Sequence, residues 1–162
     1  MVRESIYKRY IPAVVTPEHK NDSAWWFVFS SNKLLVKVKG EAIEILFAKS
    51  LEELCLKAVQ EHYLGMLDGH PCYSAELVEG APIPEGMGLQ ELRPLFELLG
   101  YDMFLLAGKA LQIVNWDQTH RYCGRCGSET ITKAEERAKV CPKCGFMSFP
   151  RLSPAIIVAV VK

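Results

Sequence analysis

The sequence predicts an α+β fold, in which a mixed N-terminal domain is followed by a small cysteine-rich module. Three observations support this prediction. Apolar segments with strand-like alternation occupy much of the first half, helix-like apolar spacing dominates residues 89–117, and two Cys-x-x-Cys pairs follow. A chain of 162 residues, 49% of them hydrophobic, can fill one ordinary domain core and carry a small appendage.

The N-terminal part is predicted to be built from strands. Residues 1–22 carry turn signals and are expected to be irregular or to form an edge strand. The apolar segments 25–29 and 33–39 flank a Ser-Ser-Asn turn, which predicts a β-hairpin. Residues 41–47 alternate polar and apolar side chains, so they are expected to form a third strand.

The middle of the chain is predicted to mix helices with one further strand. Ser50 and Glu53 have the spacing of a capping box, which predicts a helix to about residue 61. Residues 72–77 are expected to be a strand, and residues 80–88 a connector rich in proline and glycine. Two amphipathic helices are then expected, over 89–99 with Pro94 interrupting or starting it, and over 101–117.

Four cysteines give the strongest signal in the sequence. Cys123 and Cys126 form a C-G-R-C pair, and Cys141 and Cys144 form a C-P-K-C pair fourteen residues later. Zinc prefers four soft ligands in a tetrahedron, so this pattern predicts a zinc ribbon with one structural zinc ion. Two disulfides or a redox-active pair are the alternatives. A closed four-thiolate site builds structure and performs no chemistry.

The remaining sequence features exclude some classes and predict others. Lys+Arg and Asp+Glu both number 19, so the chain has no net charge to support broad electrostatic binding of nucleic acid. No signal peptide or membrane span is expected, and a reducing cytoplasm is the expected compartment. The other two cysteines, Cys55 and Cys72, lack metal spacing and are expected to be buried thiols.

Residues 155–161 form a nearly continuous apolar and β-branched run, which predicts a strand buried on both faces. Such a strand needs neighbours on both sides. We expect it to begin a further domain, although pairing within this domain or with another copy of the chain would also satisfy it.

The two Cys-x-x-Cys pairs, together with residues 120–127 and 149–158, resemble the corresponding segments of the NADH pyrophosphatases of the Nudix superfamily. The resemblance is strong from about residue 100 and weaker before it. It implies an N-terminal α+β domain, a zinc ribbon and the first strand of a Nudix domain, over residues 1–118, 119–149 and 150–162. It further implies a homodimer that uses Mg or Mn to hydrolyse NADH, NAD or NAD-capped RNA to nicotinamide mononucleotide and AMP.

The carboxylate helix of the Nudix box does not occur in these 162 residues. This chain alone is therefore expected to be inactive and to contribute recognition and assembly. The resemblance implies four substrate contacts: Lys39, Arg93, Glu136 and Phe149, the last where the family usually has tyrosine. Solvated charges, a local ion pair and ordinary packing are the alternatives for these side chains.

A stand-alone zinc-ribbon module that binds nucleic acid or protein is the competing hypothesis. The ribbon segment offers cationic and aromatic side chains for such a role. They are Lys133, Arg137, Lys139, Lys143, Tyr122, Phe146 and Phe149. A purely structural subunit that donates its last strand to a partner sheet is a third possibility.

Overall fold

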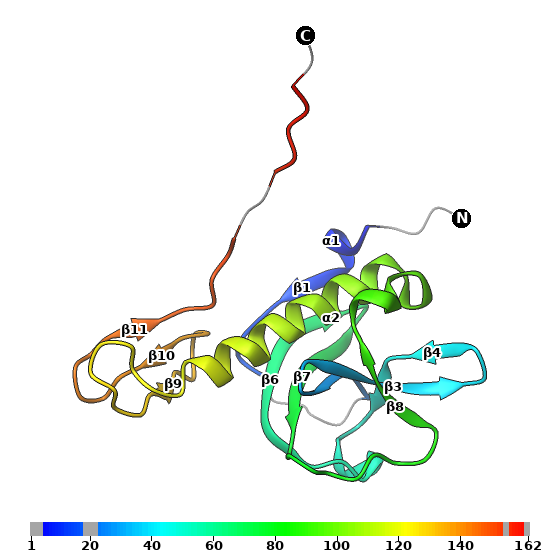
Figure 1. Cartoon of the computed structure of the whole chain (residues 1–162), viewed down its shortest axis with the longest axis horizontal. Helices are drawn as coiled ribbons and strands as arrows, with labels where there is room; N and C mark the ends of the chain where they lie inside the picture. Colours follow the sequence, from blue (N-terminus) through cyan, green and yellow to red (C-terminus); the bar gives the residue numbers. More distant parts are fainter. Residues whose placement is uncertain (1–4, 18–22, 154–155, 161–162) are drawn as a thin grey trace.

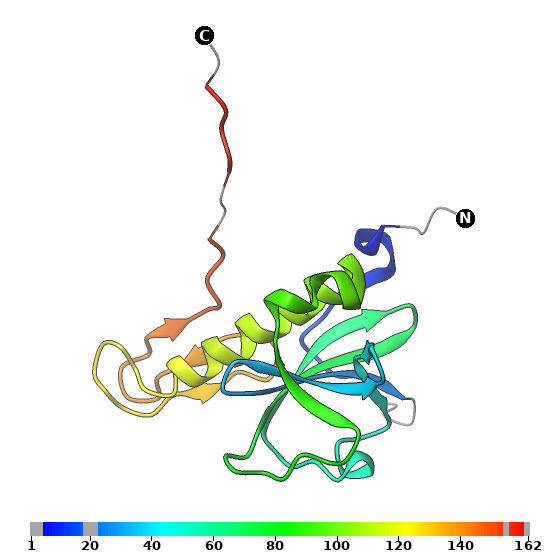
Figure 2. The same ribbon diagram turned by 45° about the vertical axis from the view of Figure 1, so that its right-hand side comes forward.

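The computed structural model describes residues 5–17, 23–153 and 156–160 (Figure 1). A large curved sheet carries one long helix, α2 (Phe96–Thr119), and a three-stranded ribbon lies at the C-terminal end of that helix. Figure 2 shows α2 lying across one side of the sheet. This mixture of sheet and helix confirms the predicted α+β class.

The large sheet has the order β1-β6-β7-β2-β3-β4, with β5 paired to β2 and β8 paired to β3. Its pairs are antiparallel except for β2 and β7, which run parallel. A short helix, α1 (Ile6–Arg9), precedes it. The strands are β1 (Tyr10–Pro12), β2 (Ala24–Ser30), β3 (Lys33–Lys39), β4 (Ala42–Glu44), β5 (Leu46–Ala48), β6 (Ala58–Leu67), β7 (His70–Leu77) and β8 (Met87–Glu91).

The predicted hairpin is present as β2 and β3. Ser31 and Asn32 form its turn with φ angles of +48° and +65°, the left-handed geometry that matches the twist of paired strands. The predicted third strand is divided in two, because β4 pairs with β3 whereas β5 crosses to the other side of the hairpin and pairs with β2. The predicted strand at 72–77 is β7.

The helix predicted from Ser50 is wrong. The Glu53 amide does donate to Ser50 Oγ at 3.4 Å, but only a single 3₁₀ turn follows, η1 (Glu52–Leu54). Cys55 ends it with a φ of +56°. The next residues belong to β6, which pairs with β7 along almost its whole length. Long-range pairing and burial therefore override the local capping signal.

The helix predicted at 89–99 is only partly correct. Residues 89–91 form the end of β8, which pairs with β3. A 3₁₀ turn, η2 (Arg93–Leu95), then leads into α2. Gly100 interrupts α2 with a φ of +73°. The helix predicted at 101–117 is confirmed, since α2 continues to Thr119.

The core lies on both faces of the sheet. Phe27 and Phe29 of β2 point toward α2, where they pack with residues such as Leu106 and Ile113. The alternate residues Trp26 and Val28 belong to a second buried cluster on the opposite face. This strict alternation explains why β2 is buried along nearly all of its length.

The C-terminal residues do not form the strand that the sequence predicts. Residues 156–160 have no strand partner in the part of the chain that the structure describes, and their side chains are exposed. Figure 1 shows this segment extending away from the rest of the chain. A strand needs a neighbouring backbone, and no segment within the described ranges lies beside these residues. Residues 155 and 161 of the predicted strand lie outside the described residues.

No helix in the described ranges is both long and apolar enough to cross a lipid bilayer.

Strand β1 is fastened at the sheet edge by Tyr10. Its hydroxyl donates to the carbonyl oxygen of Leu64 and accepts a 2.9 Å hydrogen bond from Lys109 Nζ of α2. Burial raises the pKa of the Tyr10 hydroxyl and lowers the pKa of Lys109. These contacts hold the start of the chain against both the sheet and the helix.

Gly65 should be the most sensitive glycine of this edge. Its φ is +128°, and a Cβ atom at this position would lie 2.1 Å from the carbonyl oxygen of Ile11. We expect Gly65→Ala to destabilise the fold by at least about 2 kcal/mol and to loosen β1, as measured by urea unfolding and amide exchange. Gly69→Ala is the matched control, because Gly69 also has a positive φ but no atom within 4 Å of the new Cβ. Equal effects of both substitutions would contradict the close approach.

Candidate functional site

The cysteine-rich module is a ribbon of three short strands. They are β9 (Ile131–Thr132), β10 (Lys139–Val140) and β11 (Met147–Ser148), in the order β11-β10-β9. The two cysteine turns repeat one hydrogen-bond pattern. The amides of Gly127 and Gly145 donate to the carbonyls of Cys123 and Cys141, both at 2.9 Å. Each glycine has a φ of +71°, which a residue with a side chain rarely adopts.

The four predicted thiols converge on one point. Their Sγ atoms all lie within 4.8 Å of one another, with 3.6 Å between Cys123 and Cys144 and 3.4 Å between Cys126 and Cys141. A tetrahedral ion with Zn–S bonds of about 2.3 Å would place its sulfurs roughly 3.8 Å apart. The donor set and its spacing therefore fit a structural zinc ion. All four cysteines are free thiols, and sulfur–sulfur distances of 3.6 and 3.4 Å are too long for disulfide bonds of about 2.05 Å.

The first cysteine turn also favours thiolates. Hydrogen bonds from the backbone amide and the hydroxyl of Ser128 lower the pKa of the Cys126 thiol to about 6. The Arg125 amide lies 3.4 Å from Cys123 Sγ, so the peptide groups of the turn point toward sulfur. Such amide–sulfur contacts favour the charged form that binds metal.

The other two cysteines differ from each other. Cys72 is buried in β7 as expected, and burial raises the pKa of its thiol to about 12. Cys55 is exposed, which corrects the expectation that it would be buried. Its position at the left-handed end of η1 turns its side chain away from the core.

A buried ionic cluster joins the ribbon to the N-terminal domain. Lys139 of β10 places Nζ 2.8 Å from Asp117 Oδ1 of α2, an ion pair whose angles fall outside those of a hydrogen bond. His62 of β6 lies on the other side, with Nε2 3.6 Å from the same oxygen. All three side chains are about 8% exposed. Burial lowers the pKa of His62, while the Asp117 carboxylate opposes that shift.

Arg137 makes a second contact between the ribbon and the N-terminal domain. We call the region formed by this contact and the buried ionic cluster the joint. Its Nη2 donates to the carbonyl of Tyr63 at 2.6 Å and to that of Ala13 at 3.2 Å. Both carbonyls belong to the sheet domain, whereas Arg137 precedes β10. Arg137 and Lys139 therefore anchor the strand that leads directly to Cys141. This joint was not predicted, because no spacing in the sequence links Asp117 to Lys139, which lies 22 positions further along the chain.

Lys39 and Arg93, two of the predicted substrate contacts, lie far apart. Lys39 ends β3 and pairs with Glu44 across the β3–β4 hairpin at 2.9 Å. Arg93 begins η2, just beyond the point where β8 pairs with the opposite end of β3. The length of β3, about 20 Å at a strand rise of 3.3 Å per residue, therefore separates them. Within this chain, the structure does not bring the two cations together.

Glu136 and Phe149 lie at one end of the ribbon sheet. The β10–β11 register pairs Lys139 with Ser148, so its continuation sets Phe149 opposite Ala138. Glu136 lies two residues further along and forms an ion pair with Lys133. It also lines a hollow of about 160 Å³ between the two modules, together with His62 and Arg137. Phe149 is half exposed.

The cations expected of a free nucleic-acid module are largely occupied. Lys139 and Arg137 are bound in the joint, and Lys133 pairs with Glu136. Lys143 remains exposed on the second cysteine turn. Of these four cations, only Lys143 has no partner among the contacts described above, so most of the positive charge expected of such a module is already paired.

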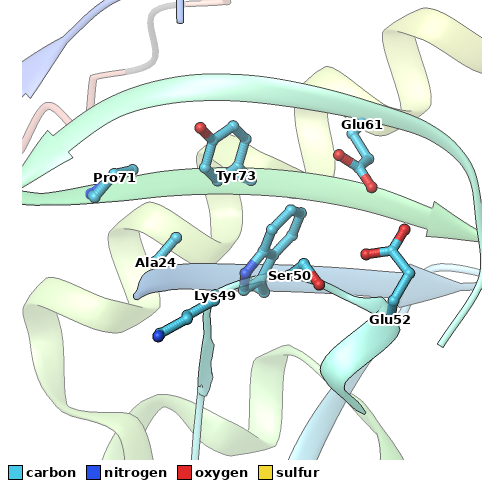
Figure 3. Close-up of a pocket in the computed structure, with 8 residues that line it drawn as sticks. Ala24, Lys49, Ser50, Glu52, Glu61, Pro71 and Tyr73 are labelled. Atoms are coloured by element: carbon cyan, nitrogen blue, oxygen red, sulfur yellow. The ribbon is translucent and has the colours of Figure 1, made fainter. Parts of the chain in front are cut away.

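A further hollow, of about 260 Å³, lies on the sheet domain and was not predicted (Figure 3). Trp26 and Tyr73 stack within it, with ring centroids 4.7 Å apart. Figure 3 shows the carboxylates of Glu52 and Glu61 near one end and Lys49 near the other. Trp26 Nε1 already donates to the carbonyl of Ala48, so this aromatic pair is part of the core packing.

Comparisons with known proteins cover both modules. A family model described as an NADH pyrophosphatase-like rudimentary NUDIX domain matches residues 23–116, and one described as an NADH pyrophosphatase zinc ribbon domain matches residues 118–149. The NAD-capped RNA hydrolase NudC of Stutzerimonas stutzeri (strain A1501) is 40% identical over 139 residues, which are 85% of this chain and 49% of that protein. The protein of the same name from Pseudomonas putida (strain W619) is 34% identical over 155 residues, which are 95% of this chain and 54% of that protein. The chain thus spans about half the length of the curated relatives it matches.

Proposed function

The chain belongs to the family of NADH pyrophosphatase-like proteins that join a rudimentary NUDIX domain to a zinc ribbon, and we propose that it forms the recognition half of a hydrolase acting on NAD(H) or NAD-capped RNA. The observation that carries this proposal is the match of both modules, in order, to that family. The names of the two relatives, NAD-capped RNA hydrolases, support the substrate class. The products would be nicotinamide mononucleotide and AMP.

The four cysteines would hold zinc, and the zinc would hold the ribbon. Cys123, Cys126, Cys141 and Cys144 supply four soft donors at the spacing of a tetrahedron. With all positions filled by thiolates, the ion would stabilise the module that presents Glu136 and Phe149. A reducing cytoplasm would suit these thiolates.

Among the described residues, no cluster of carboxylates fits the catalytic metal of the family. Glu52 lies on a single 3₁₀ turn, and Glu136 in the ribbon pairs with Lys133. Neither belongs to a helix that could hold two or more carboxylates around Mg or Mn. We therefore assign no step of hydrolysis to these residues, and propose that they bind and orient substrate and assemble a homodimer.

Glu136 and Phe149 would be the principal recognition residues of this half. The Glu136 carboxylate could accept a hydrogen bond from a ribose hydroxyl or an adenine amine, with Lys133 as its partner in the free protein. The exposed ring of Phe149 would stack on a base without the hydroxyl that tyrosine would add. Lys39 and Arg93 would each offer a positive charge to a phosphate. Because they lie on separate surfaces, we propose that they act beside a second subunit and not in one pocket of a single chain.

Calorimetric titration of the zinc-loaded chain with NADH and NAD tests this proposal. We expect Glu136→Ala and Phe149→Ala each to weaken binding about tenfold, from a lost hydrogen bond and a lost stacking contact. Phe149→Tyr should bind at least as tightly as the original protein. Glu135→Ala is the matched control, because Glu135 is the exposed neighbour of Glu136 and does not line the hollow.

Incubation of the same protein with NADH and Mn should release no AMP above background. AMP release that depends on this chain would contradict the recognition-only assignment. Absence of NADH and NAD binding would contradict the recognition role itself. Size-exclusion chromatography with light scattering would test the homodimer.

A further inference from the structure

The hollow beside Trp26 and Tyr73, which we call the sheet hollow, has a rigid apolar floor (Figure 3). The floor consists of the buried lining residues, which are Ala24 and Trp26 of β2 and Pro71 and Tyr73 of β7. Trp26 packs in the core cluster on the face of the sheet opposite α2. Pockets for drug-sized molecules measure roughly 300–1,000 Å³, so a hollow of about 260 Å³ suits a smaller ligand.

The wall of the sheet hollow is fixed as firmly as its floor. Residues 49–52 form this wall as they lead from β5 into η1. Leu51 is 1% exposed, and its carbonyl accepts the Leu56 amide at 2.9 Å. The Lys49 amide donates to the Glu53 carboxylate at 2.8 Å, which closes the turn. The hollow is therefore formed before any ligand binds, and binding needs little reordering of the protein.

The charges of the sheet hollow lie at its two ends. Glu61 of β6 is level with Val28 of β2, because both strands pair with the same residue of β7. Lys49 directly follows the residue that pairs with Ala24, at the other end of β2. Four residues of strand separate these levels by about 13 Å. Figure 3 shows the carboxylates of Glu52 and Glu61 together at one end and Lys49 at the other, so the hollow is a slot with a negative and a positive end.

The negative end favours a cation. A hydrogen bond from the Ser50 side chain lowers the pKa of Glu52, which keeps this carboxylate charged and oriented. Two neighbouring carboxylates repel each other, and a cation between them relieves that repulsion. Lys49 is the only lysine or arginine among the lining residues that the structure describes, and it lies at the far end. An ammonium group on a ligand would therefore bind beside Glu52 and Glu61.

Tyr73 gives separate evidence for a ligand. Its side chain is only 8% exposed, yet its hydroxyl makes no hydrogen bond with any residue in the described ranges. Burial raises the pKa of this hydroxyl, so it keeps its proton and is a hydrogen-bond donor at neutral pH. Figure 3 shows the hydroxyl turned away from the two carboxylates and toward Pro71. Buried hydroxyls are normally hydrogen-bonded, so a ligand acceptor at this end would complete the site.

We propose that the sheet hollow binds a zwitterionic dipeptide with an apolar side chain. Its ammonium group would contact Glu52 and Glu61, its carboxylate would contact Lys49 and the Tyr73 hydroxyl, and its side chain would pack on Trp26. Two hydrogen bonds of about 2.9 Å each occupy nearly half of the slot, which leaves roughly 7 Å, the span of two extended residues. The inference is independent of the proposed function, because none of the four predicted substrate contacts lines this hollow.

NMR titration of the zinc-loaded 162-residue chain with alanyl-leucine tests the site. The chain has three tryptophans, and the Trp26 indole is the one within the hollow. We expect its Nε1–H signal to move on titration, while the Trp116 signal stays in place. N-acetylated alanyl-leucine, which lacks the ammonium group, should bind at least about tenfold more weakly. The C-terminal amide, which lacks the carboxylate, should bind about fivefold more weakly.

Two conservative variants test the named contacts. Glu52→Gln keeps the shape of the side chain and should weaken dipeptide binding about fivefold. Tyr73→Phe keeps the ring that stacks on Trp26 and should weaken binding about fivefold through the lost hydrogen bond. Glu79→Gln is the matched control, because Glu79 is an exposed glutamate of the same domain that does not line the hollow. Its affinity should change less than twofold. Urea unfolding should be the same for all three variants.

The ligand series separates a free dipeptide from the end of a longer chain. Equal binding of the amide would assign the hollow to the N-terminus of a protein, and equal binding of the acetylated form would assign it to a C-terminus. Either result would overturn the dipeptide. An unmoved Trp26 signal, or equal losses in Glu52→Gln and Glu79→Gln, would overturn the site itself. NADH should leave the Trp26 signal in place, and displacement of the dipeptide by NADH would overturn a separate site.

Discussion

Cys141→Ser is expected to release zinc and unfold the ribbon. Zinc in small four-ligand modules contributes roughly 10–16 kcal/mol of apparent binding energy, which is also the energy that folds them. The described ribbon has only three two-residue strands, so little else can hold it together. We expect zinc content to fall from one equivalent toward zero, and proteases to cleave between residues 120 and 150. The large sheet should remain protected, because its core clusters include no cysteine of the ribbon.

Cys55→Ser is the control for this experiment. Cys55 is exposed on η1 and takes no part in the thiol cluster, so its loss should leave zinc content and digestion unchanged. An unchanged metal content and digestion pattern in Cys141→Ser would rule out the four-thiolate assignment.

Lys139→Met is expected to weaken the joint between the modules by about 3–5 kcal/mol. The substitution keeps an unbranched apolar stem but leaves the Asp117 carboxylate buried without its ammonium partner. Urea unfolding should report the loss, and digestion should begin near the joint. Asp117→Leu combined with Lys139→Met should recover much of the stability, because a well-packed apolar pair carries no unpaired charge.

The same variant should also change His62. In the original protein, burial is the main cause of the lowered pKa of His62, and Arg137 and Lys139 lower it further while Asp117 raises it. Removing the Lys139 charge should therefore raise the pKa of His62, which NMR titration can follow. Lys143→Met, which removes an exposed charge, should alter neither stability nor the His62 titration. A stability loss as large in that control would contradict the role of the buried pair.

Local signals in the sequence predicted the local parts of the structure. The Ser-Asn turn specified the hairpin because both residues tolerate a positive φ. The cysteine spacing specified the thiol cluster because each pair lies within one tight turn. The helix expected after Ser50 failed for the opposite reason. Its capping contact forms, but the residues from Ala58 onward become strand β6 because they pair with β7.

The candidate site was predictable only in part. The positions of Glu136 and Phe149 relative to the cysteines follow from their spacing, and the structure places them at one end of the ribbon. The Asp117–Lys139 pair depends on how α2 and the ribbon dock, which no periodicity encodes.

The order of strands in the large sheet also determines when the chain can fold during synthesis. Edge strand β1 pairs with β6, so Tyr10 must wait for Leu67 before it has a partner, and β2 must wait for β7. Even then, Phe27 and Phe29 lack their cover, because the buried face of α2 begins at Leu106. At about 5–20 residues per second, the gap between the end of β7 and the end of α2 lasts roughly 2–8 s. During that interval the nascent sheet exposes one of its two apolar faces, which makes it a substrate for chaperones that bind emerging chains.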